Sequence, residues 1–226
     1  HHISFTAPRG ETTAFIGSTG CGKSTVINLI PRFYDVTDGA IYLDDIDVRE
    51  VRLSDLRDKI GYVPQKGTLF SGTIESNLRY ADEAASDETL QQAADIAQAS
   101  EFIFSRPEGF EADIAQGGSN VSGGQKQRLA IARALVKKPP IYIFDDSFSE
   151  LDFKTDSALR KALEEKTGDS TILIVTQRVA TVKNADQIIV LDEGRVVGKG
   201  RHHELMQSCE TYQEIALSQL SKEELA

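Results

Sequence analysis

The sequence contains no tryptophan, one methionine and only two cysteines, Cys21 and Cys209. Two cysteines cannot form the disulfide framework of a small secreted domain. No apolar run approaches the length of about 18 residues that a membrane-spanning helix requires, and the N-terminus lacks the charged-then-apolar pattern of a signal peptide. Basic residues are outnumbered, 25 Lys and Arg against 35 Asp and Glu, so the net charge of −10 argues against a nucleic-acid partner. These deficits together favour a cytosolic, reducing environment.

The chain does have a hydrophobic fraction of 40% over 226 residues, which is enough for a buried core. Segments with a strand-like pattern also alternate regularly with segments that have a helical pattern. Runs rich in β-branched and apolar residues predict strands at 1–5, 12–16, 40–43, 60–63, 141–144, 171–175, 187–191 and 195–198. Helical periodicity predicts helices at 24–30, 54–59, 88–99, 124–136, 155–165 and 212–217. This alternation indicates an α/β fold with a mostly parallel sheet.

Three stretches depart from the alternation. Residues 72–136 are almost entirely helical in pattern, which predicts an inserted subdomain. The strand pattern begins at the first residue, so we expect the chain to be part of a longer protein. The polar tail, 221–226, is expected to fray.

The segment from Gly17 to Thr25 reads GSTGCGKST and matches the phosphate-binding loop pattern G-x-x-x-x-G-K-[ST]. Its glycines let backbone N–H groups point inward toward an anion, and a helix beginning near Lys23 adds its positive end. Lys23 can place a charge between the outer phosphates, and the Ser24 hydroxyl can ligate Mg²⁺. The predicted nucleotide-binding residues here are Gly17, Ser18, Thr19, Gly20, Cys21, Gly22, Lys23, Ser24 and Thr25.

Two further stretches suit the same chemistry. The apolar run 141–144 ends in Asp145 and Asp146, and in phosphate-loop enzymes the first Asp after such a strand helps to hold Mg²⁺. A second candidate anion site lies at Ser122, Gly123, Gly124 and Gln125, before a long predicted helix. Ser122 suits an N-cap, whereas two glycines in a first helical turn cost about 1 kcal/mol each, so an ordinary capped helix explains them poorly.

With these motifs, the chain resembles the nucleotide-binding domain of an ATP-binding cassette (ABC) transporter. The motifs shared with that family extend over nearly the whole chain in the expected order: the phosphate loop, Gln65, the signature 121–125, Asp145, the D-loop 149–152 and the switch 176–178. The segments 70–78 and 112–118 resemble the exporter branch of the family, in which the second contacts the coupling helices of the transmembrane domain.

The resemblance implies a phosphate-loop (RecA-like) core at 1–71 and 137–226, a truncated N-terminal antiparallel β part, and a helical subdomain at 72–136. It implies that ATP and Mg²⁺ bind, with Ser24, Gln65 and Asp145 near the metal, and that Gln65 is also one of the catalytic residues. It also implies a head-to-tail dimer with a second nucleotide-binding domain, in which each ATP lies between one phosphate loop and the partner's signature. Such a domain works on the cytoplasmic side of a membrane, against transmembrane coupling helices.

Three positions depart from active members of the family. Asp146 stands where they have the catalytic Glu, Gln177 where they have the switch His, and Glu150 where the D-loop usually has Ala. Asp146 is one methylene shorter than Glu, and a displacement of about 1 Å can cost on the order of 100-fold in rate. Gln177 donates a hydrogen bond but never carries a positive charge. We therefore expect ATP binding with weak hydrolysis, as in the degenerate half of a heterodimeric exporter of small molecules or drugs; tolerated changes in a working ATPase are the alternative.

Two further expectations concern the same site. The family stacks adenine on an aromatic residue well upstream of the phosphate loop, and Phe5 lies too close to the loop for this role, so we expect weakened recognition of the base. A bulky adduct on Cys21 is expected to block nucleotide sterically, although a small residue that merely fits this position is the simpler interpretation.

Other functional classes compete with the transporter motor. A DNA-repair or chromosome-maintenance ATPase would separate the phosphate loop from the signature by a long coiled coil, which this sequence lacks. An ABC importer subunit and a nucleotide-sensing module that moves nothing both stay open. A contact to a membrane domain, sought within 66–118, would discriminate among them.

Overall fold

The structure, a computed structural model, describes residues 1–220, and the predicted fraying of 221–226 lies outside them. It divides into two compact units, which are described one at a time. Of the described residues, the first unit contains 1–60, 140–146 and 169–220, and the second contains 61–139 and 147–168. Among residues 1–220, none of the helices combines the length and the apolar character that a membrane span requires.

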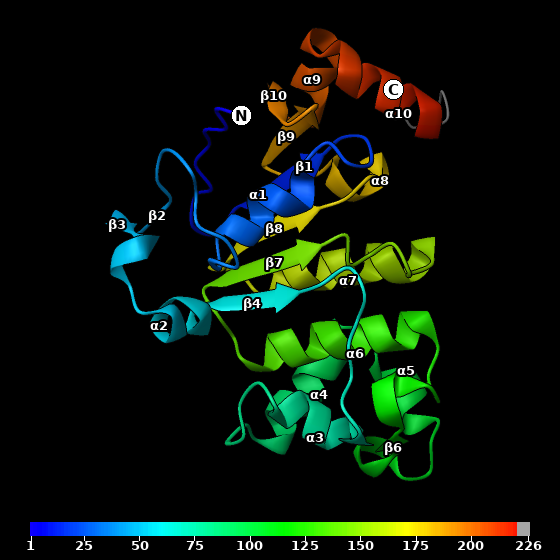
Figure 1. Ribbon diagram of the computed structural model, residues 1–226. Coiled ribbons are helices and arrows are strands. Elements are labelled where there is room, and N and C mark those ends of the chain that lie inside the picture. The colour runs from blue at the N-terminus through cyan, green and yellow to red at the C-terminus, as the bar shows by residue number, and fades with distance from the viewer. Residues whose placement is uncertain (221–226) are drawn as a thin grey trace. The chain divides into compact units, whose positions relative to one another are not determined.

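The first unit is built around a mostly parallel sheet, as the sequence predicts (Figure 1). Its strands are β1 (Thr12–Ile16), β7 (Ile141–Asp145), β8 (Thr171–Val175), β9 (Gln187–Asp192) and β10 (Arg195–Gly200). They lie in the order β10-β9-β1-β8-β7, in which only β10 runs antiparallel to its neighbour. Strand β4 (Ile60–Val63) begins in this unit and ends in the second. The central strands β1, β8 and β7 are almost wholly buried, which explains why they read as continuous apolar runs.

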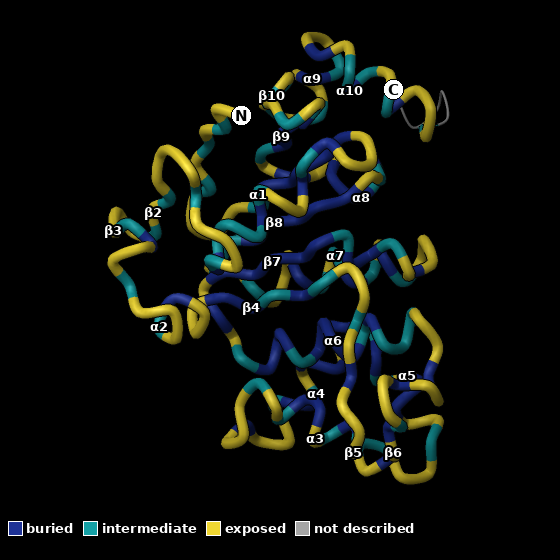
Figure 2. The backbone as a smooth tube through the Cα atoms, viewed as in Figure 1, coloured by how far each residue is buried: buried dark blue, intermediate teal, exposed yellow. Residues whose placement is uncertain are grey.

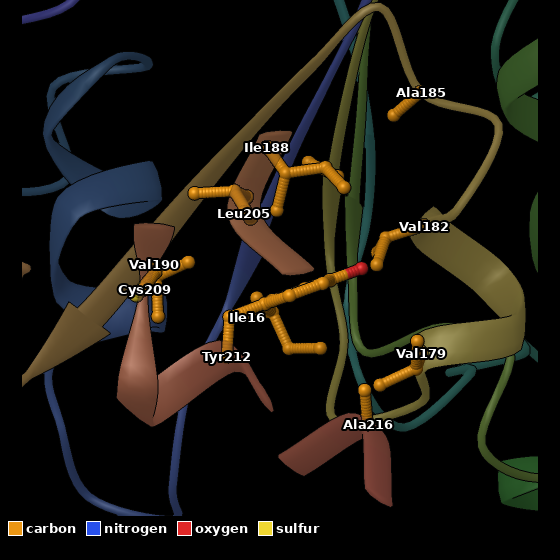
Figure 3. Close-up of a cluster of buried hydrophobic side chains, with 11 residues drawn as sticks. Ile16, Val179, Val182, Ala185, Ile188, Val190, Leu205, Cys209, Tyr212 and Ala216 are labelled. Atoms are coloured by element: carbon orange, nitrogen blue, oxygen red, sulfur yellow. The ribbon is translucent and has the colours of Figure 1, made fainter. Parts of the chain in front are cut away.

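The remaining elements of the first unit are helices and a short hairpin. They are α1 (Lys23–Leu29), β2 (Tyr42–Leu43), β3 (Ile46–Asp47), the 3₁₀ turn η1 (Val48–Glu50), α2 (Leu53–Asp58), α8 (Val179–Val182), α9 (His202–Ser208) and α10 (Glu210–Gln219). One hydrophobic cluster joins β1 and β9 to α8, α9 and α10 (Figure 3). Its largest member, Tyr212, is fully buried and its hydroxyl forms a hydrogen bond of 2.8 Å with Nδ1 of His202. The C-terminal helices are therefore part of the core that supports β1.

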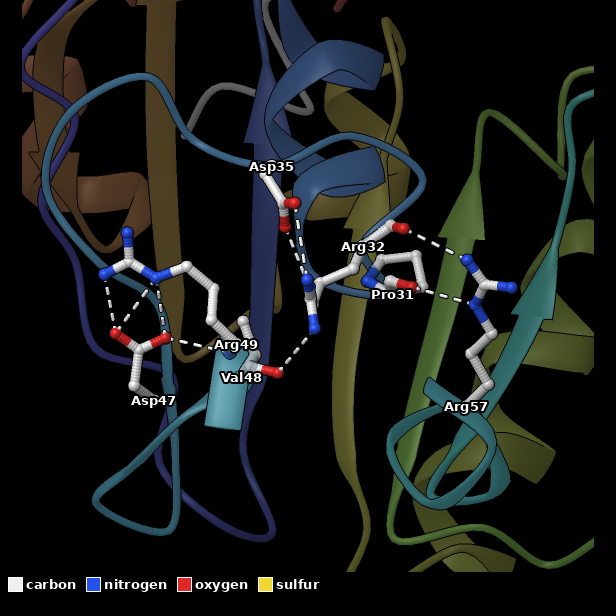
Figure 4. A network of polar contacts seen from close by, with 7 residues as sticks. All are labelled: Pro31, Arg32, Asp35, Asp47, Val48, Arg49 and Arg57. Carbon is white, nitrogen blue, oxygen red and sulfur yellow. Dashed lines mark hydrogen bonds and ion pairs between the residues drawn. The ribbon is translucent and has the colours of Figure 1, made fainter. Parts of the chain in front are cut away.

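Polar contacts fix the chain that follows α1 (Figure 4). The guanidinium of Arg57, on α2, donates to the carbonyl oxygens of Pro31 and Arg32 at 3.0 Å each. Arg32 in turn pairs with Asp35 and donates to the carbonyl of Val48. Because α1 carries the phosphate-loop lysine at its start, these contacts hold the far end of the helix in place.

The second unit is mainly helical. It contains β5 (Gly72–Thr73), α3 (Ile74–Arg79), α4 (Asp87–Ile96), α5 (Ser100–Phe104), η2 (Gly109–Glu111), β6 (Asp113–Ile114), η3 (Gln116–Gly118), α6 (Gly123–Val136) and α7 (Phe153–Lys166). Helix α6 packs against α3 and α4, and α4 also packs against α7. Most of α6 is buried, as the dark blue stretch of the tube shows (Figure 2). The segment 72–136, predicted as a subdomain, lies inside this unit.

The structure corrects several local predictions. Residues 1–8 form no strand; instead, the ring of Phe5 packs edge-on against Phe15 at 5.1 Å. The helix expected at 88–99 ends at Ile96 because Gln98 adopts a left-handed backbone with φ of 57°, and α5 begins after it. The strand expected at 40–43 is reduced to Tyr42–Leu43. Helices α8 and α9 were not predicted, and α3 was covered only by the general helical prediction for 72–136.

Candidate nucleotide-binding site

The phosphate loop connects β1 to α1 at the carboxyl end of the parallel strands, where ligands bind in open α/β sheets. Gly17 has φ of 157°, and a Cβ at this position would lie 2.1 Å from the carbonyl oxygen of Leu191. Gly22 caps α1 with φ of 100°. Both positions require glycine, for lack of space at the first and for backbone conformation at the second. Ser18, Thr19, Gly20, Ser24 and Thr25 are exposed, which leaves this side of the loop open to a ligand.

Lys23 is the most constrained charge of the loop. Its side chain is buried, and Nζ donates to the carbonyl oxygens of Gly17 at 2.8 Å and Ser18 at 2.7 Å. The thiol of Cys21, also buried, lies 3.6 Å from Nζ. A buried ammonium needs such partners because desolvation of an unpaired charge is costly. The ammonium is thus held across the loop, close to where phosphate oxygens would accept its hydrogen bonds.

Of the three residues predicted to hold Mg²⁺, Ser24 and Asp145 lie side by side in the first unit. The Ser24 hydroxyl donates to Oδ1 of Asp145 at 2.7 Å, although the two residues are far apart in the sequence. Asp145 is buried at the end of β7. A hydroxyl and a carboxylate placed side by side at a phosphate loop are oxygen ligands that suit Mg²⁺, which when bound neutralises charge on the outer phosphates. Gln65 belongs to the second unit.

The predicted catalytic positions Asp146 and Gln177 follow two neighbouring strands, β7 and β8. Asp146 has a left-handed backbone with φ of 49°, and its N–H donates to the carbonyl of Val175 at 2.8 Å. The Thr19 hydroxyl donates to Oε1 of Gln177 at 3.2 Å. Within the first unit, the switch residue therefore contacts the phosphate loop directly.

In the second unit, the predicted signature forms the start of α6. Ser122 is the N-cap, and its hydroxyl accepts a hydrogen bond from the N–H of Gln125 at 3.2 Å. The Gln125 side chain accepts from the N–H of Ser122 in return, which completes a capping box. Gly123 and Gly124 thus occupy the first turn of a helix of 14 residues, where N–H groups and the helix dipole favour an anion.

Helix α6 also holds the segment that carries Gln65. The side chain of Gln127, almost fully buried, accepts from the N–H of Gly67 at 2.8 Å and donates to the carbonyl of Pro64 at 3.1 Å. Arg133 donates to the carbonyl of Thr68 at 2.8 Å. Sequence reasoning did not single out Gln127 or Arg133 for this role. Gly67 could have indicated this contact, because a glycine can mark a place where another segment of backbone approaches closely. In the structure, a Cβ on Gly67 would lie 2.9 Å from the carbonyl oxygen of Lys126.

Known proteins resemble this chain in sequence and in fold. A sequence model of the family described as ABC transporter matches residues 1–149. The chain belongs to the ABC transporter family. A protein of Mycobacterium tuberculosis, described as an uncharacterized ABC transporter ATP-binding protein, is 50% identical over 220 residues, which are 96% of this chain and 38% of the relative. The ATP-dependent lipid A-core flippase of Vibrio vulnificus is 42% identical over 215 residues, 95% of this chain and 37% of the flippase.

A solved structure gives the same family. A bacterial Atm1-family ABC exporter with ATP bound superposes with a TM-score of 0.95 at 36% sequence identity, over 98% of this chain and 39% of that one. The chain is thus an ATPase domain of the exporter-type ABC proteins, and it spans about two-fifths of the length of the proteins that it matches.

Glu150, which was expected to differ from the family pattern, lies beside the first turn of α6 in the second unit. A Cβ on Gly123 would lie 2.9 Å from Oε2 of Glu150, so this carboxylate stands beside the first turn of α6. The carbonyl oxygen of Glu150 would lie 3.2 Å from a Cβ on Gly124. The D-loop and the signature of the second unit are therefore in close contact, and the glycines of the signature allow it.

Proposed function

We propose that this ABC domain is the ATP-binding motor of a heterodimeric exporter, and that its own phosphate loop binds Mg-ATP but supports little hydrolysis. The observation that carries the proposal is the contrast within one site. The loop, Lys23 and the Ser24–Asp145 pair have the arrangement that nucleotide binding requires, whereas the two catalytic positions carry Asp146 and Gln177.

Binding is assigned to the loop residues. The inward N–H groups and Lys23 would neutralise the phosphates, and Ser24 and Asp145 would hold the metal, together with Gln65. Gln177 is proposed to face the γ-phosphate from its contact with Thr19. Hydrolysis requires a group that positions or deprotonates the attacking water, and this is the role that the shorter side chain of Asp146 would fill poorly.

The partner is proposed to be a second, different ABC domain. Its phosphate loop would receive Ser122, Gly123, Gly124 and Gln125 from this chain, and productive turnover would take place there. Coupling helices of a transmembrane domain on the cytoplasmic side of a membrane are the second proposed partner, and a small molecule or drug is the proposed cargo. The likeness to an exporter and to a flippase supports export over import.

Nucleotide binding and hydrolysis by the purified chain test this proposal. We expect Mg-ATP to bind, Lys23→Ala to abolish binding, and the unmodified chain to hydrolyse ATP slowly. Asp146→Glu combined with Gln177→His should raise turnover by at least tenfold when the chain dimerises, because each change restores a group that acts on the same step. Robust hydrolysis by the unmodified chain as a homodimer would refute the degenerate site.

A further inference from the structure

Gln219, the last residue of α10, forms two hydrogen bonds with the backbone of residues 177–179. These residues overlap the predicted switch, 176–178, and are called the switch segment below. Its Nε2 donates to the carbonyl oxygen of Gln177 at 2.7 Å, and its Oε1 accepts from the N–H of Val179 at 2.9 Å. The two bonded backbone groups lie on either side of Arg178. One amide side chain therefore holds both ends of the segment, much as a neighbouring strand would.

The second of these bonds satisfies a group that the local structure leaves open. Val179 is the first residue of α8, and the N–H groups of a first helical turn have no partner within their own helix. The acceptor comes from Gln219, which is 40 residues further along the chain. Thr176 stabilises the segment from the other side, since its buried hydroxyl accepts from the N–H of Arg178 at 3.1 Å.

The switch segment connects Gln219 to the phosphate loop. The backbone carbonyl of Gln177 is bonded to Gln219, and the side chain of the same residue accepts from the Thr19 hydroxyl at 3.2 Å. All of these residues belong to the first unit. A continuous set of hydrogen bonds thus runs from the end of α10 to the loop that is proposed to bind ATP.

Helix α10 is anchored independently of Gln219. Tyr212 and Ala216 are fully buried in the hydrophobic cluster, beside Val179 and Val182 of α8 (Figure 3). Gln219 itself is exposed. Its position is therefore set by the packing of the helix, and replacing its amide should leave that packing intact.

We propose that Gln219 is a positioning residue for the switch, through which α10 fixes Gln177 for its contact with the γ-phosphate. The inference rests on the proposed function, because it requires ATP at the phosphate loop. It predicts that the amide of Gln219, at the end of α10, raises the preference of the chain for Mg-ATP over Mg-ADP.

The test compares the affinities of the purified chain for Mg-ATP and Mg-ADP. Gln219→Leu removes both hydrogen bonds at similar side-chain volume, and Gln219→Glu keeps the acceptor for Val179 but loses the donor to Gln177. Gln213→Leu is the matched control, because Gln213 lies on the same helix and donates to the carbonyl of Met206 at 3.0 Å.

For Gln219→Leu we expect the preference for ATP over ADP to fall roughly three- to tenfold, which is the range that one neutral hydrogen bond supports. ADP affinity and the melting temperature should match those of Gln213→Leu, and Gln219→Glu should lower the preference at least as much as Gln219→Leu, because it turns a carboxylate oxygen toward the carbonyl oxygen of Gln177. In a Gln177→Ala background, Gln219→Leu should have no further effect on the preference, because the residue that it positions is gone.

The outcomes separate this inference from the proposed function. If the wild type shows no binding that depends on Lys23, the proposed function is overturned and this inference with it. If ATP binds normally but Gln219→Leu keeps the same preference as Gln213→Leu, or weakens ATP and ADP equally, only the positioning role of Gln219 is overturned.

Discussion

Asn77 offers a direct test of how the second unit is held together. It lies on α3, almost fully buried, and its side chain forms hydrogen bonds of 2.9 Å with the N–H of Phe70, the carbonyl of Phe70 and the carbonyl of Thr73. The amide thus closes the turn that leads from the Phe70 segment into α3. This geometry explains why an Asn stands at this place in the exporter-like segment 70–78.

We expect Asn77→Ala to lower the free energy of unfolding by about 3 kcal/mol. Each hydrogen bond contributes about 1 kcal/mol net, so that three of them account for the sum. Water cannot fully replace the lost amide because Asn77 is only 1% exposed, although Phe70 is 45% exposed and its backbone regains part of its solvation. In a chain of this size the melting temperature should fall by about 6–12 °C.

Thermal and urea unfolding followed by circular dichroism measure the effect. Gln92→Ala is the control, since Gln92 is exposed on α4 of the same unit and its side chain donates to the Glu88 carboxylate at 3.2 Å; it should change stability by less than about 0.5 kcal/mol. Asn77→Asp keeps the shape but turns a carboxylate toward two carbonyl oxygens, so it should be at least as harmful as Ala. A loss below about 1 kcal/mol in Asn77→Ala, or wild-type stability in Asn77→Asp, would refute the reasoning.

Three further predictions concern charge and space. Hydrogen bonds from Arg49 lower the pKa of Asp47 from 3.8 to about 2, so the pair stabilises the fold at neutral pH and loses that contribution as the pH falls through about 2; Arg49→Gln should return the Asp47 pKa toward 3.8 in an NMR titration. Gly17→Ala would place a Cβ 2.1 Å from the Leu191 carbonyl oxygen, and we expect it to cost about 3 kcal/mol and more than tenfold in ATP affinity, as measured by unfolding and calorimetry. Glu150→Ala removes a negative charge beside the signature, where the ATP of a partner would bind, so sedimentation should show ATP-dependent dimerisation of the chain strengthened by about fivefold; unchanged dimerisation would show that this charge does not repel the ATP.

Contiguous motifs were predictable because their chemistry is encoded locally. Gly22 meets a backbone requirement within the loop, so the position of the loop before a helix followed from the sequence. The buried strands β1, β7 and β8 appeared as apolar runs with bounds that the structure changes by at most one residue. The N-cap at Ser122 was likewise visible from the residues that follow it.

Short or unpaired elements were not predictable in this way. The strand expected at 1–5 failed because extended residues become a strand only when a neighbour completes the hydrogen-bond ladder. Helix α8, of four residues, and the break at Gln98 show no periodic signal. Of the predicted site, the roles of Asp146, Gln177 and the signature stay predictions until nucleotide binding is measured.

The family pattern, the phosphate loop and the residues at the two expected catalytic positions can be read from the residues alone, because each depends on residue identity within a short stretch. Which distant side chains support those residues depends on how the chain folds. Ser24 meets Asp145 across 121 positions, Gln127 meets Gly67 across 60, and Gln219 meets Gln177 across 42. A hydrogen bond needs its donor and acceptor within about 3 Å, and over such separations only the packing of strands and helices brings them together.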